Sequence, residues 1–266
     1  MKLNAAQHDA AAASLYGAEK SGVVIDPIST TYPDADVEDA YTIAQRVVQL
    51  KVADGRVVKG HKVGLTSKAM RSIARAQEPD FATLTDDFFV FEGSTVSPAK
   101  MNDAKVEVEI AFVLGKDLPG PWINVAEVIQ ATDFILPCLE IVDQRQKSGG
   151  PTPLVDTIAD AASCGFVVLG ANPRRLTDLD VRRVGAVLLK NGDQEVSGTG
   201  AAVMGNPVNS VAWLANKLLS FGTTLRAGQV LLSGSFVRAI PFGPGDTLTA
   251  IFGDGLGEVT LSVGKA

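Results

Sequence analysis

The segment from Lys105 to Gly115 constrains the fold of this chain more than any other. It reads KVEVEIAFVLG, so charged and apolar residues alternate before the run becomes continuously apolar. This pattern, rich in β-branched residues, is typical of a strand that enters a core. Residues two apart on a strand point to the same face, so Glu107 and Glu109 are expected side by side, with the apolar residues between them packed into the core.

Two carboxylates on one face of a buried strand repel each other and are costly to desolvate. A hard divalent cation would neutralise them, and oxygen ligands suit Mg²⁺, Mn²⁺ or Ca²⁺. An exposed strand face carrying two glutamates is an equally good interpretation of this pair alone. Glu140 favours the metal, because it lies in the otherwise apolar strand LPCLEIV, where a lone carboxylate needs a partner. An ion pair between Glu140 and Arg145 is the alternative.

The segment Gly60–Ser67 (GHKVGLTS) places Lys62 in an apolar strand bounded by glycines. A lysine in this setting either has a lowered pKa or pairs with a substrate carboxylate. The alternative is a lysine whose ammonium group reaches the surface. His61 is adjacent to Lys62 and would face the other side of the strand, which favours a structural role for it.

Acidic residues next to proline and aromatics, in Glu78–Phe81 (EPDF) and Asp86–Phe89 (DDFF), are typical of loops that close over a site. No glycine-rich phosphate loop stands out. The chain has no GxSxG motif and only 2 histidines, which argues against a Ser-His-Asp hydrolase.

The first 55 residues favour helices, one over residues 4–20 and one over residues 37–53. The second is predicted to begin at the N-cap Asp36, with Asp39 at its third position, and to end at Gly55. From residue 56 short Val/Ile/Leu runs lie between turns, in a chain with 26 glycines and 13 prolines. We therefore predict an α+β protein with a helical part, residues 1–55, and a larger, mostly β part, residues 56–266.

Further elements are predicted within the second part. Helices are expected at 67–77, 124–132 and 208–219, and strands at 57–58, 61–65, 105–115, 136–142, 166–169, 184–190, 230–232 and 257–263. Asn191-Gly192 is a hairpin turn signal.

The net charge of −6 argues against nucleic acid as a partner, and no basic tract suits an anionic membrane surface. No apolar run approaches the ~18 residues of a membrane span, and the N-terminus has no uninterrupted apolar signal core. Cys138 and Cys164 lie in apolar contexts without metal-binding spacing, so buried free thiols are expected. These features predict a soluble, cytoplasmic protein.

Several segments occur together in one order: GHKVGLTSKAM, EPDF, KVEVEIAFVLG, ATDFILPCLEIVDQR, VDTIADAAS, GNPVNSVAWLANKL and AGQVLLSGSF. Together they resemble the family of 2-oxopent-4-enoate hydratases, 2-oxohept-3-ene-1,7-dioate hydratases and 4-oxalocrotonate decarboxylases, in the fumarylacetoacetate-hydrolase-like superfamily. The resemblance extends from about Ile28 to Val263. The segments GHKVGLTSKAM, EPDF, DDFF and GSFVR are most similar to the dioate hydratases of homoprotocatechuate breakdown.

The resemblance implies a mixed β-roll or sandwich of the fumarylacetoacetate-hydrolase type, with Mg²⁺ or Mn²⁺ as cofactor. It also implies a homo-oligomer, a pentamer or decamer, and allows a complex with an enzyme of the same pathway. The site residues fall into three groups. Glu107, Glu109 and Glu140 would bind the metal, Lys62 and Asp80 would be catalytic, and Leu65, Ser67 and Arg238 would contact the substrate.

The implied reaction is hydration of a 2-hydroxy-2,4-dienoate or its 2-oxo tautomer. The substrate carboxylate and 2-oxygen would be bound at the metal, and water would add to the remote end of the conjugated system. Lys62 would pair with the carboxylate or donate a proton, and Asp80 would position or deprotonate the water. Arg238 would bind the distal carboxylate of a dioate.

Three other activities remain open: decarboxylation of 4-oxalocrotonate, C–C hydrolysis of an acylpyruvate, and a non-catalytic scaffold role. Three positions depart from the family pattern. Ala161 stands where asparagine is usual, which would remove a polar contact. Asn206 stands where histidine is usual, and Ala82 where glycine is usual, which would alter a turn and the packing. These departures bear on the substrate more than on the fold.

Overall fold

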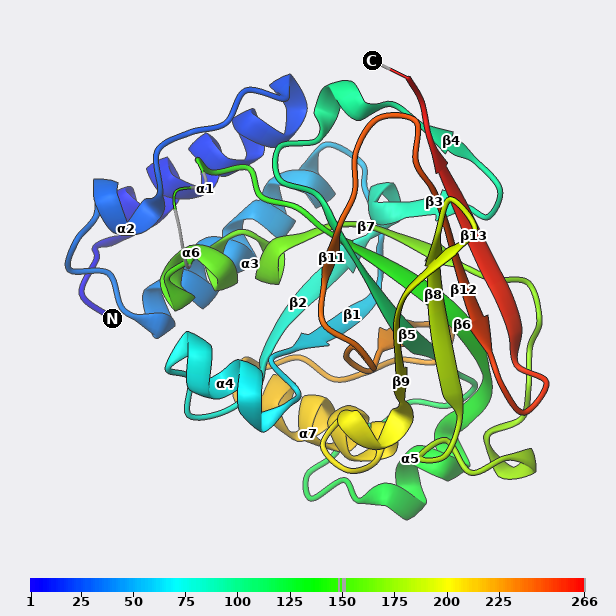
Figure 1. Cartoon of the computed structure of the whole chain (residues 1–266). Helices are drawn as coiled ribbons and strands as arrows, with labels where there is room; N and C mark the ends of the chain where they lie inside the picture. Colours follow the sequence, from blue (N-terminus) through cyan, green and yellow to red (C-terminus); the bar gives the residue numbers. More distant parts are fainter. Residues whose placement is uncertain (148, 150–151, 266) are drawn as a thin grey trace.

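Two mixed β-sheets and a layer of helices make up this molecule (Figure 1). The computed structural model describes residues 1–147, 149 and 152–265. The larger sheet has 8 strands. Its order is β2 (Asp80–Thr85), β1 (Val58–Gly64), β10 (Val230–Leu232), β5 (Lys105–Leu114), β6 (Thr132–Val142), β7 (Cys164–Leu169) and β3 (Phe89–Phe91), and β11 (Ile240–Pro241) also pairs with β5.

The second sheet has 5 strands. Its order is β4 (Thr95–Val96), β13 (Gly257–Val263), β12 (Thr247–Phe252), β8 (Gly185–Lys190) and β9 (Asp193–Thr199). The pairs β1–β10, β3–β7 and β4–β13 are parallel, and the other neighbouring strands are antiparallel. This is the expected α+β arrangement.

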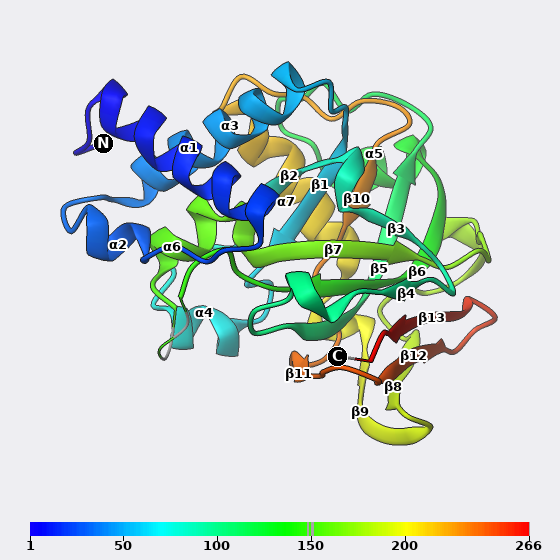
Figure 2. The same ribbon diagram turned by 90° about the horizontal axis from the view of Figure 1, so that it is seen from above.

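Helices cover one side of the larger sheet and the ends of its strands. Figure 2 shows α1 (Ala5–Ser21), α2 (Ile28–Thr31), α3 (Val37–Ala53) and α6 (Leu154–Ala159) gathered on one side of the molecule. The remaining helices are α4 (Lys68–Ala74), α5 (Val125–Ala131) and α7 (Pro207–Leu219), and α5 packs on α7. Short 3-10 turns lie at Asp86–Phe88, Pro98–Lys100, Ala161–Ser163, Leu176–Asp178 and Gly200–Ala202.

The predicted start of α3 is confirmed. The Asp36 side chain accepts a hydrogen bond from the Asp39 backbone N–H, and the Asp39 side chain accepts one from the Asp36 N–H, which is a reciprocal capping box. Asp39 is fully buried, and it also contacts His8 Nε2 at 2.8 Å and accepts from the Lys2 N–H. This one carboxylate therefore ties α1 and the N-terminus to α3.

The two faces of the larger sheet contribute to two different apolar clusters. On one face Val108, Ile110 and Leu139 are fully buried in the main core, with side chains from the helices and the smaller sheet. On the other face Cys138 and Cys164 belong to a small cluster. Both cysteines are free and buried, as expected.

The boundary at residue 55 stays a prediction. Helix α6, which comes from the second part of the chain, packs on α3 from the first part. Side chains from both parts, such as Ile43 and Val106, lie in the same apolar cluster.

One expectation about local structure was wrong. Asp80 and Phe81 of the EPDF segment open strand β2 instead of lying on a loop. The reason is that residues 80–85 (DFATLT) pair with β1 between Val58 and Gly64. The Asn191-Gly192 hairpin is confirmed, with φ of 57° and 89° between β8 and β9. Among the described residues, no helix is both long and apolar enough to cross a membrane.

The turn between α6 and β7 holds three successive residues in the left-handed region: Ala161, Ala162 and Ser163, with φ of 52°, 48° and 58°. This conformation costs a non-glycine residue roughly 1–2 kcal/mol. We predict that Ala161→Gly raises the free energy of unfolding by about 1 kcal/mol, measured by urea denaturation. Ala159→Gly, at the last residue of α6 and outside the left-handed region, is the control and should lower stability by a similar amount. A loss of stability in Ala161→Gly would show that this turn is not strained.

Candidate active site and metal centre

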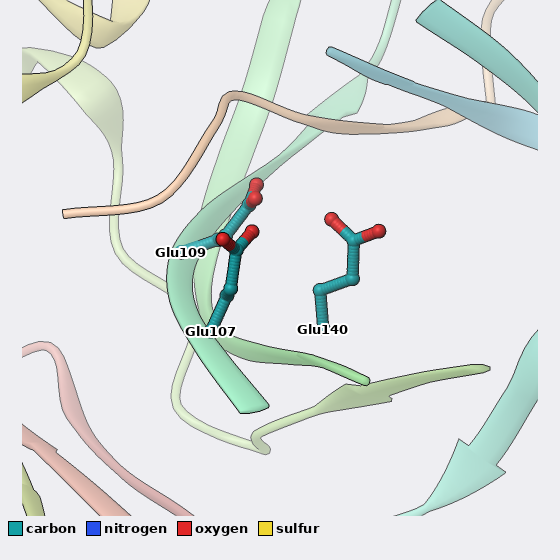
Figure 3. A group of neighbouring side chains, drawn as sticks. All are labelled: Glu107, Glu109 and Glu140. Atoms are coloured by element: carbon teal, nitrogen blue, oxygen red, sulfur yellow. The ribbon is translucent and has the colours of Figure 1, made fainter. Parts of the chain in front are cut away.

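Three glutamates on two adjacent strands converge on one point. Glu107 and Glu109 lie on β5 and Glu140 lies on β6, where Glu107 and Glu140 are direct cross-strand partners. Each carboxylate offers one oxygen such that these oxygens lie within 4.8 Å of one another. Figure 3 shows the three carboxylate groups turned toward a common space. Glu109 and Glu140 are buried, whereas Glu107 is partly exposed.

The strand register and one backbone amide hold these side chains in place. Alternation along β5 puts Val106, Val108 and Ile110 into the core and turns the two glutamates to the opposite face, as expected. The Gly234 N–H donates to Glu109 Oε2 at 2.7 Å. Gly234 has φ of 111°, and a Cβ atom there would lie 2.4 Å from Thr66 Cγ2, so only glycine suits this position.

Lys62 is buried and its ammonium group lies 2.7 Å from Glu140 Oε1. Neither alternative weighed for these residues is found. Lys62 does not reach the surface, and Arg145 binds Asp160 instead of Glu140. Burial acts to lower the pKa of Lys62, but Glu140 and the other nearby acidic groups, among them Asp80 and Glu107, together outweigh it and the pKa is raised. The side chain is therefore a fixed cation beside the glutamates.

Asp80 lies on the same face, from the adjacent strand β2, and is 2% exposed. Its register partner is Gly64, where a Cβ atom would approach Asp80 Oδ1 to 2.2 Å. Gly64 thus leaves the room that the carboxyl group fills. Burial raises the pKa of Asp80 to about 6, and the Lys62 charge opposes that rise.

Buried polar atoms at the site lack hydrogen-bond partners among the described residues. They include both carboxylate oxygens of Asp80 and Glu140 Oε2, whereas Glu140 Oε1 faces the Lys62 ammonium group. Buried polar groups are nearly always hydrogen-bonded, so such a group of orphan oxygens points to a bound species. Four carboxyl groups face one ammonium group here, and the oxygen-only donor set is the kind that hard divalent cations prefer. These residues fit a divalent metal ion.

Burial and the close approach of these carboxyl groups raise the pKa values of the two glutamates on β5. Burial first, and then the Glu140 carboxylate, raise the pKa of Glu107 to about 7. The same two causes raise the pKa of Glu109 well above its ordinary value. Without a cation, both groups therefore keep their protons to a higher pH than an ordinary glutamate does.

The three residues that were predicted to contact the substrate lie in different parts of the structure. Leu65 lies in the turn after β1, in the left-handed region with φ of 54°. Ser67 caps α4, and its side chain accepts a hydrogen bond from the Met70 N–H. Arg238 is exposed, in the segment between Phe236 and Ile240 that runs beside β5. The structure therefore brings Lys62, Asp80 and the three glutamates together, while Arg238 makes no ion pair among the described residues.

His61 faces away from Lys62, as expected. It is 1% exposed, and its Nδ1 lies 3.2 Å from Thr83 Oγ1 on β2. Burial lowers the pKa of His61 to about 4, so the ring is neutral at physiological pH.

Sequence reasoning missed the supporting residues Gly64, Thr66, Gly234 and Arg71. The Arg71 Nη1 donates to the carbonyl oxygens of Leu65 and Thr66, at 2.8 and 2.9 Å. The two glycines carried a signal, since each interrupts or directly follows a strand pattern. Arg71 carried none, because a guanidinium that holds a turn has no sequence periodicity.

The three departures from the family pattern have separate structural settings. Asn206 caps α7 by accepting from the Val208 N–H, so it serves as a helix N-cap. Ala82 is buried on β2 opposite Lys62. Ala161 packs beside the small cluster that contains Cys138.

The raised pKa values predict proton-linked metal binding. A cation must displace the protons of Glu107 and Glu109, so the affinity for Mn²⁺ should rise about tenfold or more from pH 6 to pH 7, with proton release. Titration calorimetry in buffers of different ionisation enthalpy measures both quantities.

Two variants provide the controls for this titration. Glu140→Gln should weaken Mn²⁺ binding by more than about tenfold. Glu258→Gln, on the exposed part of β13, should leave it unchanged. A pH-independent affinity in the parent protein would contradict the prediction.

The sequence of this chain is similar to a protein-family model and to known hydratases. Residues 50–263 match the family model described as fumarylacetoacetate (FAA) hydrolase C-terminal. The chain is 42% identical over 252 residues to the 2-oxo-hept-4-ene-1,7-dioate hydratase of Escherichia coli, covering 93% of this chain and 94% of that protein. It is 40% identical over 253 residues to the 2-keto-4-pentenoate hydratase of Paraburkholderia xenovorans (strain LB400), covering 95% and 93%.

The 4-oxalocrotonate decarboxylase from Pseudomonas putida G7, complexed with magnesium and adipate, has a similar structure. Its TM-score is 0.94 at 33% sequence identity, over 98% of this chain and 99% of that chain. The same enzyme complexed with calcium and acetate gives a TM-score of 0.93. The chain therefore belongs to the fumarylacetoacetate hydrolase C-terminal family, as a member of its hydratase and decarboxylase branch.

Proposed function

We propose that this protein is a divalent-metal-dependent hydratase that adds water to a 2-oxo or 2-hydroxy dienoic acid, with a 2-oxoheptene-1,7-dioate as its substrate. The observation that carries the proposal is the convergence of Glu107, Glu109 and Glu140 beside Lys62 and Asp80. Its support is that this constellation occurs in a chain 42% identical to a dioate hydratase.

Glu107, Glu109 and Glu140 would hold Mg²⁺ or Mn²⁺. The metal would supply Lewis-acid polarisation of a bound 2-oxo acid. The related decarboxylase was solved with magnesium and with calcium, which supports a hard divalent cation. Mg²⁺ is the ion that we propose first.

Lys62 and Asp80 have complementary roles in the proposed reaction. The Lys62 ammonium group, a fixed cation, would pair with the substrate C1 carboxylate and orient it. Asp80, with its pKa raised to about 6, is mostly a carboxylate at neutral pH and can accept a proton from the attacking water. In the 2-oxo-3-ene tautomer of the substrate, the water oxygen then bonds to C4, and the proton taken from the water is returned to C3. The product is a 4-hydroxy-2-oxo acid.

A second candidate function is decarboxylation of 4-oxalocrotonate. The TM-score of 0.94 to a decarboxylase supports it, and the same charged residues would serve it. Hydration of the five-carbon 2-hydroxypenta-2,4-dienoate is a third candidate, supported by the 40% identical pentenoate hydratase. A cytoplasmic location and a homo-oligomeric assembly, pentameric or decameric, stay predictions.

The proposed function predicts a specific product. With Mg²⁺, 2-hydroxyhepta-2,4-diene-1,7-dioate should lose its ultraviolet absorbance and gain the mass of one water. The reaction should stop with a chelator. Loss of CO₂ from 4-oxalocrotonate as the faster reaction would instead assign a decarboxylase.

Two aspartate variants refine this assay. Asp80→Asn keeps the shape of the side chain but removes its base function, so kcat should fall by about 100-fold or more while the metal still binds. Asp254→Asn, exposed between β12 and β13, is the matched control and should keep full activity. Full activity in Asp80→Asn would remove Asp80 from the mechanism.

A further inference from the structure

Arg71 is a partly buried cation that has no acidic partner among the described residues. It lies on α4, a short helix that buries none of its side chains. Its Nη1 donates to the carbonyl oxygens of Leu65 and Thr66, at 2.8 and 2.9 Å. A guanidinium has five N–H donors, so its Nε and Nη2 groups remain available.

A short series of contacts connects Arg71 to the three glutamates. Arg71 binds the Thr66 carbonyl oxygen, the Thr66 side chain packs against Gly234, and the Gly234 N–H donates to Glu109 Oε2 at 2.7 Å. Three successive contacts thus link the guanidinium to Glu109, one of the three glutamates. Figure 1 shows α4 beside the end of β1, the strand that carries Lys62.

The other cations near the site are already bound or are unanchored. Lys62 is paired with Glu140, and the Arg145 guanidinium binds Asp160 together with backbone carbonyl oxygens. Arg238 is exposed, and among the described residues its side chain makes no hydrogen bond or ion pair. Arg71 differs from Arg238 because its guanidinium is held in place before any ligand binds.

We propose that Arg71 is a specificity-determining residue that binds the distal carboxylate of a dicarboxylic substrate. This proposal rests on the proposed function and adds to it the residue that distinguishes a dioate from a monoacid. A guanidinium binds a carboxylate through paired hydrogen bonds, and one that is already anchored loses less freedom on binding. A dioate held at its oxo-acid end beside Lys62 carries its second carboxylate several bonds further out, and the turn that Arg71 holds directly follows the strand that carries Lys62.

Loss of a charged hydrogen bond to a carboxylate predicts a selective effect. In Arg71→Gln the ratio of kcat/KM for 2-hydroxyhepta-2,4-diene-1,7-dioate to that for 2-hydroxypenta-2,4-dienoate should fall about tenfold to a hundredfold. A general weakening of the turn would lower kcat/KM for both substrates alike, so it would not change this ratio. Arg75→Gln, exposed at the end of the same helix, is the matched control and should leave the ratio unchanged.

Ligand binding provides a readout that does not need turnover. With the Mn²⁺-loaded protein, calorimetry should show adipate binding more tightly than hexanoate, and Arg71→Gln should remove most of that preference. If the parent protein hydrates neither dienoate, the proposed function fails, while this titration still tests Arg71.

Three results would overturn the proposal. Equal losses on both substrates would make Arg71 a positioning residue for the turn only. No change in the ratio would show that it binds no distal carboxylate. A fall of the ratio in Arg238→Gln and not in Arg71→Gln would assign that carboxylate to Arg238.

Discussion

Electrostatic repulsion among three closely spaced glutamates is the constraint on which the rest of this site depends. Two unit charges about 5 Å apart repel by roughly 3 kcal/mol at an effective dielectric constant of ~20. The summed repulsion of three such pairs is as large as the whole free energy of unfolding of a typical domain, ~5–15 kcal/mol. The fold must therefore supply a compensating charge. Lys62 supplies one, the raised pKa values of Glu107 and Glu109 represent bound protons, and a divalent cation would supply the remainder.

Backbone geometry, more than side-chain packing, keeps these charges together. Cross-strand pairing places Glu107 directly opposite Glu140, so neither can separate without shifting the β5–β6 register. Glycines at 64 and 234 allow Asp80 and Thr66 to approach where any Cβ atom would clash. Leu65 lies between Gly64 and Thr66 in the chain, and its strained backbone is held by a hydrogen bond from Arg71. Such strain is common where a chain must present groups in one fixed geometry.

Much of this site could be predicted from the sequence because strand periodicity determines side-chain direction. The pairing of Glu107 with Glu109 and the opposite orientation of His61 and Lys62 follow from a period of two. The partner of Lys62 did not follow, because β1 and β6 are separated by two other strands in the sheet. Asp80 and Phe81 of the EPDF segment were mistaken for loop residues, since pairing with β1 outweighs the local turn signal of Pro79, while Glu78 and Pro79 lie outside the strand. The anchoring role of Arg71 depends on tertiary contact alone.

The most direct test of the central claim is a crystal structure of the protein soaked in Mn²⁺, with anomalous diffraction to locate the ion. We predict one strong anomalous peak at the point where the carboxylates of Glu107, Glu109 and Glu140 converge, within about 2.3 Å of an oxygen of each. The Lys62 ammonium group should remain beside Glu140. A peak elsewhere, or none at a concentration that saturates binding in solution, would contradict the assignment of these glutamates as metal ligands.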